Sequence, residues 1–384
     1  MTIPSYPHGF EFSDDSHTNA DQWRGPARVR LSDPGDLLAA VPGLLGFPPE
    51  RSIVAVCLSG RPVSTLGAVM RHDLVLGCSG TPTASMRAAL EHFGSVFERE
   101  QATGVLVVVV DDRFAYPDEM TSRRELCAVI ESLENLLATT STELLDVFIT
   151  AEIAEGAEWF SYFGDGRGLQ SDPMASHIAL ARVLEGRAIR SSREELEATV
   201  EAGPALERRH IAELIEIIRE SVDLRRELAR RSNPLRGDRQ ELESVLAHIA
   251  RVSAGEPLLA PECAELALAL TNPAVRDSLL ALAVGDFADD AEQLWTFLVR
   301  CLPDPERATA AALLGYSAYV RGEGPMAGIA LAAALESDPD HGLAQLLDTA
   351  LQSGLRPVQV RELASMGFDR AAELGVALPR ATDD

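Results

Sequence analysis

The chain has 384 residues, and its 34 basic and 59 acidic side chains give a formal net charge of −25. This length predicts roughly two to three domains, and 46% hydrophobic with 24% charged residues is typical of a folded protein. All 34 basic residues are arginine. The absence of lysine excludes a Walker-type phosphate loop, a Schiff base and every other chemistry that needs an ammonium group.

The net charge of the chain and the length of its apolar stretches predict which partners it binds and where in the cell it lies. A strongly acidic chain repels nucleic acid and anionic membranes, and the longest strongly apolar stretch, residues 104–110, is far too short to span a bilayer. The first 23 residues lack the basic start and apolar middle of a signal peptide. We therefore expect a cytoplasmic protein that binds neither nucleic acid nor a membrane.

Motifs for metal binding and nucleophilic catalysis are missing from the sequence. The five cysteines are far apart and include no Cys-x-x-Cys pair, and the eight histidines show no ligand spacing. There is no Gly-x-Ser-x-Gly elbow either. We expect reduced and mostly buried thiols, no metal site and no cofactor.

The N-terminal part begins with a polar segment. Residues 1–27 are acidic and aperiodic, with several proline and glycine breakers, which predicts a mobile tail. A short helix is expected next. Asp33 caps its start, Pro34 takes the first helical position, and Pro42-Gly43 ends it.

Strands and helices alternate from residue 52 to residue 163. The apolar run 52–58 is typical of a central strand covered on both faces, and a glycine-proline turn returns the chain into an antiparallel neighbour at 66–76. The further elements expected are helices at 84–100 and 122–139 and strands at 104–110, 145–151 and 158–163. This order predicts an α/β domain with a mixed sheet flanked by helices over residues 28–170.

The remainder of the chain predicts an all-α domain. It covers residues 171–378 and precedes a short C-terminal tail at 379–384, so the fold class expected for the whole chain is α+β or α/β. Its first long helix, at 207–231, is amphipathic. The apolar stripe of this helix consists of Ile211, Leu214, Ile215, Ile218, Val222 and Leu228.

Within 275–355, one segment matches the offsets of a tetratricopeptide unit, with small residues at Gly315, Ala318, Gly322, Ala327 and Ala334 and a closing Pro339. A degenerate copy lies 36 residues earlier, where Ala291 matches Ala327 and Pro303 matches Pro339, but Leu298 replaces the small residue at Ala334. Tetratricopeptide-like packing would present a concave groove over residues 286–355. The alternative is a plain helical bundle that uses the same small residues.

Several strings in the chain resemble one family. DLLAAVPGLLGFPPERSIVAV, followed by the Arg-His-Asp-Leu of the second predicted strand, resembles the opening of an actinobacterial family known as a domain of unknown function, DUF family 4192. WFSYF, SSREEL and GEGPMAGIALAAALESDPDHGLAQLL resemble its middle and C-terminal parts. The resemblance covers about residues 31–361 and implies no established activity, cofactor or catalytic residue.

Four charged residues are candidates for a ligand site at the carboxyl edge of the sheet. Asp111 and Asp112 follow the strongest predicted strand, where two carboxylates can hold a cation or act as acid and base, or can form a solvated loop. Arg71 and Asp73 alternate onto one face of their strand. They can grip an anionic ligand, or form an ion pair that secures a neighbouring loop.

Aromatic residues supply the remaining candidates. Trp159 and Tyr162 have polar tips that can orient a ligand, or they can cover the end of the sheet. Phe47, beside the rigid Pro48, looks exposed and can serve as a docking point for a partner, or can fix the entry into the first strand.

Two functions stay open from the sequence. The first is a non-catalytic protein-interaction or regulatory module whose partner is an unidentified cytosolic protein or peptide. The alternative is a small-ligand-binding protein or enzyme with its site at the carboxyl edge of the N-terminal sheet.

Overall fold

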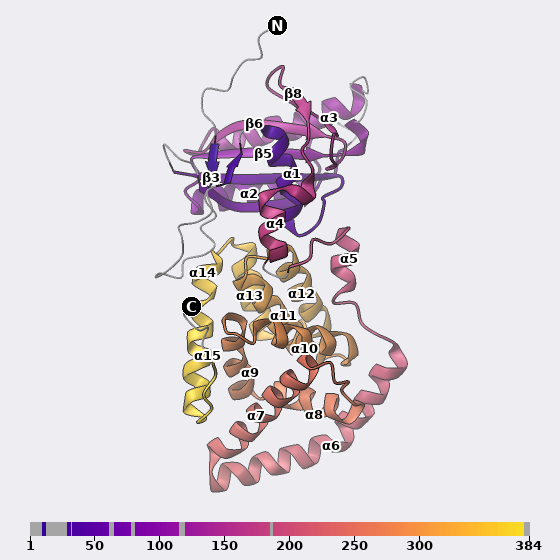
Figure 1. Ribbon diagram of the computed structural model, residues 1–384, viewed down its shortest axis with the longest axis vertical. Helices are drawn as coiled ribbons and strands as arrows, with labels where there is room; N and C mark the ends of the chain where they lie inside the picture. Colours follow the sequence, from indigo (N-terminus) through magenta and orange to yellow (C-terminus); the bar gives the residue numbers. More distant parts are fainter. Residues whose placement is uncertain are drawn as a thin grey trace. The chain divides into compact units, whose positions relative to one another are not determined.

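The computed structural model describes residues 10–12, 29–31, 33–60, 65–77, 81–114, 120–184 and 187–379. The chain forms two compact units, Met1–Arg193 and Glu194–Asp384. The first contains a mixed six-stranded sheet with helices, and the second is largely helical, so the predicted fold class is confirmed (Figure 1).

Both predicted tails fall almost entirely outside the described residues. Within the N-terminal one lies β1 (Phe10–Phe12), which pairs antiparallel with β2 (Val29–Leu31) just after the predicted tail. The sequence indicated neither strand.

The six-stranded sheet has the order β4-β3-β5-β6-β7-β8. Its strands are β3 (Ser52–Ser59), β4 (Thr65–Asp73), β5 (Gly104–Val110), β6 (Glu143–Thr150), β7 (Glu158–Ser161) and β8 (Arg167–Leu169). Only β5 and β6 are parallel, and α3 (Met120–Leu137) connects them, as a parallel pair requires. The sequence did not predict β8, because three residues around a glycine are too short to show alternation.

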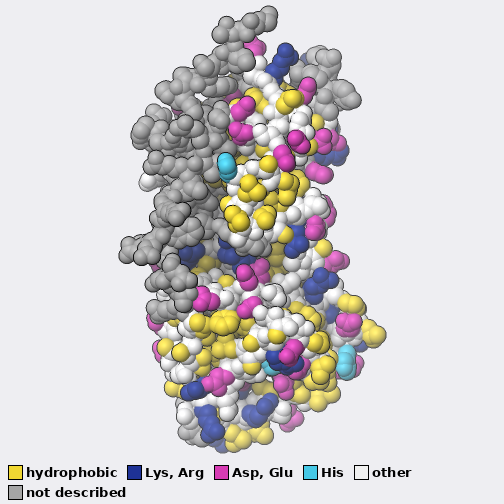
Figure 2. Space-filling model, viewed as in Figure 1, with side chains coloured by type: hydrophobic (Ala, Val, Ile, Leu, Met, Phe, Trp, Pro, Cys, Tyr) yellow, Lys and Arg dark blue, Asp and Glu magenta, His cyan; other side chains and the backbone are white. Residues whose placement is uncertain are grey.

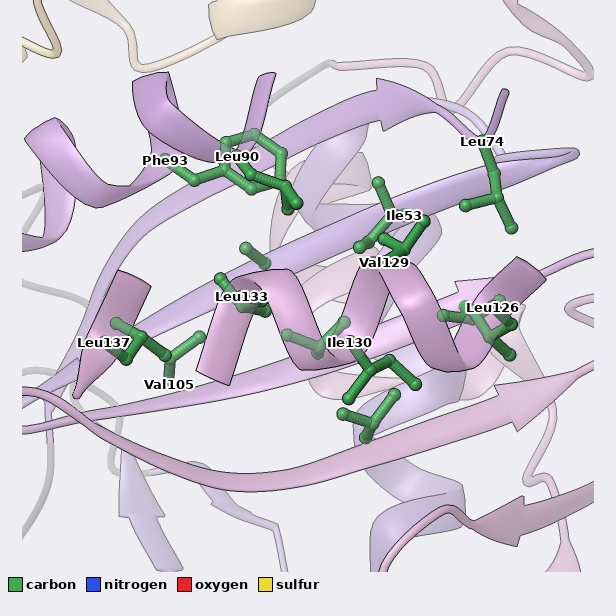
Figure 3. Packing of buried hydrophobic residues seen from close by; sticks show 14 of the residues in the cluster. Ile53, Leu74, Leu90, Phe93, Val105, Leu126, Val129, Ile130, Leu133 and Leu137 are labelled. Carbon is green, nitrogen blue, oxygen red and sulfur yellow. The ribbon is translucent and has the colours of Figure 1, made fainter. Parts of the chain in front are cut away.

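One face of the sheet is covered by α2 (Ala84–Arg99) and α3. Ile53, Val105 and their neighbours on this face form one buried cluster with apolar side chains of both helices. Figure 3 shows Val129, Ile130 and Leu133 of α3 over the strands. The apolar residues of α2 and α3 recur every three to four positions, which is why the helical periodicity predicted them.

The opposite face carries α1 (Pro34–Leu45). Asp33 caps this helix by accepting a 2.8 Å hydrogen bond from the Gly35 amide. The prediction that Pro42-Gly43 ends the helix is wrong, since one more turn follows and the helix ends at Gly46, whose φ is 87°. Pro42 lacks only the amide that would bond back into the helix, and its carbonyl still accepts a 2.8 Å bond from Gly46.

Two short helices complete this unit. η2 (Pro173–Ala175) and α4 (His177–Leu184) both pack on α1.

The second unit is largely helical. Its helices are α5 (Arg193–Ala198, beginning at the boundary), α6 (Ala205–Ser232), α7 (Pro234–Ser253), α8 (Ala260–Leu270), α9 (Pro273–Leu279), η3 (Leu280–Val284), α10 (Ala288–Cys301), α11 (Arg307–Val320), α12 (Gly324–Ser337), α13 (Gly342–Gln352), α14 (Pro357–Val360) and α15 (Glu362–Glu373).

The long helix α6 packs on α8 and α7 through part of the predicted stripe. Ile211, Ile215 and Val222 are buried, whereas Leu228 is exposed, so its assignment to the stripe is wrong. Arg226 takes the next inner position instead. Its guanidinium pairs with Glu241 at 2.8 Å and donates to the Leu268 carbonyl oxygen at 2.7 Å.

Helix α11 is buried at all 14 of its residues and packs against α10, α12 and α13. Gly315 permits the approach of α12, since a Cβ at this position would lie 2.8 Å from Leu331. A helix without a free face cannot line a groove. The groove that the sequence suggested over residues 286–355 is therefore not formed by α11.

In the part of the chain that the structure describes, no single helix is long and apolar enough to cross a membrane. One pair of consecutive helices, α8 and the segment Pro273–Val284, is together long and apolar enough, by length and composition only, but the two are bent by 95° relative to each other.

Candidate functional site

One edge of the sheet collects most of the polar residues that the sequence singled out. Here β3 begins and β4, β5 and β6 end, and we call this place the sheet edge. A row of backbone partners crosses all six strands at this edge: Asp73, Ser52, Val110, Thr150, Trp159 and Gly168. Asp111 and Asp112 follow directly after this row.

Asp111 is fully buried and belongs to an ion pair with Arg113. The Arg113 Nε lies 2.8 Å from one carboxylate oxygen and 3.0 Å from the other, and the Arg113 amide donates to the same carboxylate at 3.0 Å. A second guanidinium nitrogen donates to the Leu74 carbonyl oxygen at 3.1 Å. The hydrogen bonds that the Arg113 guanidinium donates to Asp111 are the main reason why the pKa of Arg113 is raised. Asp111 therefore ties the loop after β5 to the end of β4.

Asp112 lies beside Asp111 but in solvent. Its two carboxylate oxygens accept bonds of 2.7 and 2.9 Å from Arg51, and both side chains are more than 60% exposed. The hydrogen bond from Arg51 lowers the pKa of Asp112 to about 2. The two adjacent aspartates thus bind two different arginines and do not converge on a common point.

Arg71 and Asp73 lie on the same face of β4, as alternation predicted, and His72 lies on the other. Their register partners are Val54 and Ser52 for the first pair and Ile53 for the histidine. Arg71 contacts Asp73 at 2.6 Å and donates to the Ser52 hydroxyl at 2.9 Å. Of the two alternatives for Arg71 and Asp73, a grip on an anionic ligand or an ion pair, these contacts support the ion pair.

The sheet edge therefore carries three separate arginine–aspartate pairs. Two of the arginines, Arg51 and Arg113, were missed from the sequence. A signal existed, because Arg51 immediately precedes β3 and Arg113 immediately follows the two aspartates, so antiparallel pairing of β3 with β5 brings them to the same edge.

Trp159 packs inside the sheet edge against α1. Its ring meets Phe148 edge-on at a centroid distance of 5.5 Å. A Cβ at Gly35 of α1 would lie 3.3 Å from the Trp159 Nε1 atom, and a Cβ at Gly168 would lie 3.0 Å from it. The indole N–H is buried and has no hydrogen-bond partner among the described residues. Two glycines thus make the room that this indole occupies.

A second polar group lies next to Trp159 in the same layer. The Gln170 amide nitrogen donates to the Thr150 hydroxyl and to the Glu152 carbonyl oxygen, both at 2.8 Å. The Gln170 Oε1 atom is buried, and the described part of the chain supplies no donor to it. An N–H and a C=O group in one region of the sheet edge therefore have no partner among the residues that the structure describes.

Tyr162 lies away from the sheet edge. It follows the far end of β7, packs against the cluster under α2 and α3, and shares a hydrogen bond with Cys127. Burial is the main reason why the pKa of this tyrosine is raised, and the bond to Cys127 adds to it. The structure thus separates Tyr162 from Trp159, although both were candidates for one ligand site.

The expectation that Phe47 is an exposed docking point is wrong. Its side chain is 2% exposed and belongs to the core, and Pro48 beside it is half-buried. The loop is held down by a 2.8 Å hydrogen bond from the Arg190 amide to the Gly46 carbonyl oxygen. Burying a large aromatic ring is favourable because it removes apolar surface from water. The buried Phe47 supports the alternative that this segment fixes the entry into β3.

The chemistry available at the sheet edge is limited by these pairings. Asp73, Asp111 and Asp112 are each bonded to a guanidinium, and no group of three or more His, Cys, Asp or Glu side chains among the described residues is placed to hold a metal ion. The exposed Arg51–Asp112 pair is the part most open to exchange with a ligand.

Comparison with known proteins gives one match. The model of a family described as a domain of unknown function, DUF4192, matches residues 34–358. No curated protein and no solved structure matches the chain.

Proposed function

The chain belongs to the DUF4192 family, a domain of unknown function, and we propose that it acts in the cytoplasm as a non-catalytic protein-interaction or regulatory module. Its partner is a protein or peptide that docks on the helical unit.

The observation that carries this proposal is the outer face of α6. Leu206, Ile217 and Leu224 are 76%, 73% and 59% exposed. Their spacings of 11 and 7 residues put them on one line along the helix, opposite the buried Ile211 and Ile215. An apolar line of this length on an otherwise polar outer face is typical of a surface that a partner covers. Figure 2 shows apolar side chains among charged ones at the lower end of the view, where α6 lies in Figure 1.

The helical hairpins behind α6 suit the role of a rigid support. We propose that residues 275–355 pack in a tetratricopeptide-like manner, and the close approach of α11 and α12 at Gly315 supports this. Since α11 is buried throughout, the binding surface that we propose is the outer face of α6 and not a groove along α11.

The test is affinity capture of the tagged full chain from its native cytosol. We expect a stoichiometric protein partner that is lost from a double variant, Ile217→Glu with Leu224→Glu. The matched control is the double variant Leu346→Glu with Met366→Glu, which adds the same two charges on α13 and α15 at side chains that are 58% and 65% exposed. Circular dichroism should show that all three proteins have the same helix content.

Equal retention of the partner by the double variant would refute docking on α6. Loss of the partner from the control as well would mean that added charge, and not this face, abolishes binding.

A second candidate function is a small-ligand site at the sheet edge. It is favoured by the exposed Arg51–Asp112 pair and by the two buried polar atoms without described partners, Trp159 Nε1 and Gln170 Oε1. Native mass spectrometry of the purified chain should then reveal a retained small molecule that Arg51→Ala releases. A spectrum of bare protein for both would remove this candidate.

A further inference from the structure

The outer face of α6, the longest helix of its unit (Figure 1), carries a row of acidic side chains beside the apolar line of Leu206, Ile217 and Leu224. We call this row the acidic ridge. Its members are the exposed Glu213, Glu216, Glu220 and Asp223. Their spacings of 3, 4 and 3 residues are those of neighbours on one face of a helix. At about 100° per residue, all four lie on the same side of Ile217, roughly 40 to 120° round the helix. The acidic ridge therefore runs parallel to the apolar line.

Arginines of the chain neutralise the acidic ridge only in part. Glu216 contacts Arg219 at 3.4 Å, but this arginine is nearer to Glu306, at 2.7 Å. The other three members of the ridge form no ion pair with a residue that the structure describes. Of the exposed arginines of α6, Arg209 precedes the ridge by one turn and Arg225 lies on the opposite side of the apolar line. The ridge therefore presents an excess of negative charge to solvent.

The placement of the acidic ridge indicates a helix as the partner. Ile217 and Leu224 are seven residues apart, and Glu213 and Glu220 beside them are also seven apart. With Ile217 at a d position, both glutamates take g positions, whose charges select the helix that packs alongside. The apolar line from Leu206 to Leu224 is about 27 Å long at 1.5 Å per residue. A partner helix of similar length could cover it with its own apolar face.

We propose that the partner of α6 is a basic amphipathic helix, with apolar residues seven apart and Arg or Lys on the side that meets the acidic ridge. This inference rests on the proposed function, because it names the class of protein that docks on the outer face of α6. Positive side chains beside Glu213 and Glu220 would neutralise the ridge and orient the bound helix, while burial of the apolar line would supply affinity.

A second copy of this chain fits the same face less well. Each copy carries a net charge of −25, so two copies repel each other. In an antiparallel pair of α6 helices, the acidic g positions of one copy, Glu220 and Glu227, would face those of the other. Like charges in direct contact are destabilising, whereas lysine or arginine at these places would be attracted.

The experiment measures, by fluorescence anisotropy, how the full chain binds two probe peptides. Both peptides have about three heptads with leucine at a and d, and they carry either lysine or glutamate at e and g. At physiological ionic strength, we expect the lysine peptide to bind about tenfold or more tightly than the glutamate peptide. The double variant Glu213→Arg with Glu220→Arg should reverse the order of the two peptides.

A matched charge control separates the acidic ridge from the net charge of the chain. Glu91→Arg with Glu362→Arg makes the same change of charge at exposed positions of α2 and α15. This control should bind both peptides as the wild type does.

A second pair of variants tests the apolar line without changing any charge. Ile217→Ser with Leu224→Ser should weaken binding of the lysine peptide by about tenfold, because apolar surface is no longer buried. Leu346→Ser with Met366→Ser, at exposed positions of α13 and α15, should leave this binding unchanged.

Three outcomes would overturn the inference. The first two are equal binding of both peptides by the wild type and an unchanged order of the peptides in the variant of the acidic ridge. The third is a dimer in light scattering that Ile217→Ser with Leu224→Ser dissociates, which would assign the face to a second copy. Because the two peptides are compared on the unmodified chain, a variant that fails to fold does not affect the test.

Failure of this inference can be distinguished from failure of docking on α6. If Ile217→Glu with Leu224→Glu loses the cellular partner while the wild type does not discriminate between the peptides, docking on α6 stands and the basic class of partner is wrong. If that variant retains the cellular partner, docking on α6 is refuted, and the inference that rests on it is refuted as well.

Discussion

Asp111 and Asp112 are neighbours in the chain but lie in different environments at the sheet edge. Asp111 is fully buried and accepts bonds from both the amide and the guanidinium of Arg113, whereas Asp112 pairs with Arg51 in solvent. A buried carboxylate that is fully bonded determines local structure, while an exposed pair contributes little to stability. At the scale of single residues, burial and not residue type therefore sets the role.

Replacing each aspartate by alanine should show this difference. Asp111→Ala should lower the free energy of unfolding by about 1–3 kcal/mol, since it removes a buried acceptor to which the amide and the guanidinium of Arg113 both donate. Asp112→Ala should lower it by about 0–1 kcal/mol. Urea unfolding of both variants measures the difference, and equal effects would contradict the assigned environments.

Gly35 provides a second test at a single position. A Cβ there would lie 2.5 Å from the Leu169 carbonyl oxygen and 3.3 Å from the Trp159 Nε1 atom. Gly35→Ala should therefore destabilise the sheet unit by about 1–3 kcal/mol, although alanine is the better helix former. The matched control is Gly342→Ala at the start of α13, where a Cβ meets nothing within 4 Å. This control should be neutral or stabilising by up to about 1 kcal/mol in the same unfolding assay.

Secondary-structure elements were predictable wherever one pattern was long and consistent. β3 and β5 are covered on both faces, so their sequences are apolar at nearly every position, and α2 shows a clear helical period. The end of α1 was not predictable, because Pro42 removes only one hydrogen bond and the following turn is stabilised by burial. For α6, apolarity suggested Leu228 as an inward residue, but the inner line continues at Arg226, which bonds to Glu241.

The ligand candidates were predictable only in part. Strand ends and alternation place Arg71, Asp73, Asp111 and Asp112 at one edge, and the register agrees. Sequence does not reveal which arginine each aspartate binds, because this depends on contacts between strands that are distant in the chain. The hydrogen bond from the Arg190 amide to the Gly46 carbonyl oxygen, next to Phe47, also joins segments that are distant in the chain.

Helix α13 begins with a histidine cap that depends on pH. The His341 Nδ1 atom accepts a 3.3 Å bond from the Ala344 amide, and its Nε2 atom lies 3.1 Å from the Thr309 hydroxyl. Burial, with Arg276 as a second cause, lowers the pKa of His341 below its ordinary value of 6.5. The unfolded chain therefore binds the proton more readily, and the cap stabilises the fold above pH 6.5.

This contribution should be lost as the pH falls from 6.5 through the lower pKa of the folded state. His341→Asn keeps a capping side chain that does not titrate. Between about pH 7.5 and about pH 5, the wild type should lose more unfolding free energy than the variant. His92, whose pKa is also lowered, is present in both proteins and cancels in the comparison. Parallel pH profiles would refute the capping role.

At the scale of the whole molecule, the chain consists of two units that each have their own core. Residues 1–193 bury both faces of a sheet, and residues 194–384 surround a central helix. A unit with its own buried core and a polar surface is expected to fold alone.

Expression of the two units as separate chains tests this independence. Each of the fragments 1–193 and 194–384 should give a single cooperative melting transition with the secondary structure that it has in the full chain. A fragment without a cooperative transition would show that its core is completed by the other unit.

The complete burial of α11 should slow the exchange of its amide hydrogens with solvent. An amide in the middle of this helix exchanges with heavy water only when several surrounding helices separate from it, because no face of α11 opens to solvent by itself. Residues 307–320 should therefore retain their protons longest in the helical unit. Their exchange rates would then report the lifetime of the folded unit, while those of α6, on the surface, report only local fraying.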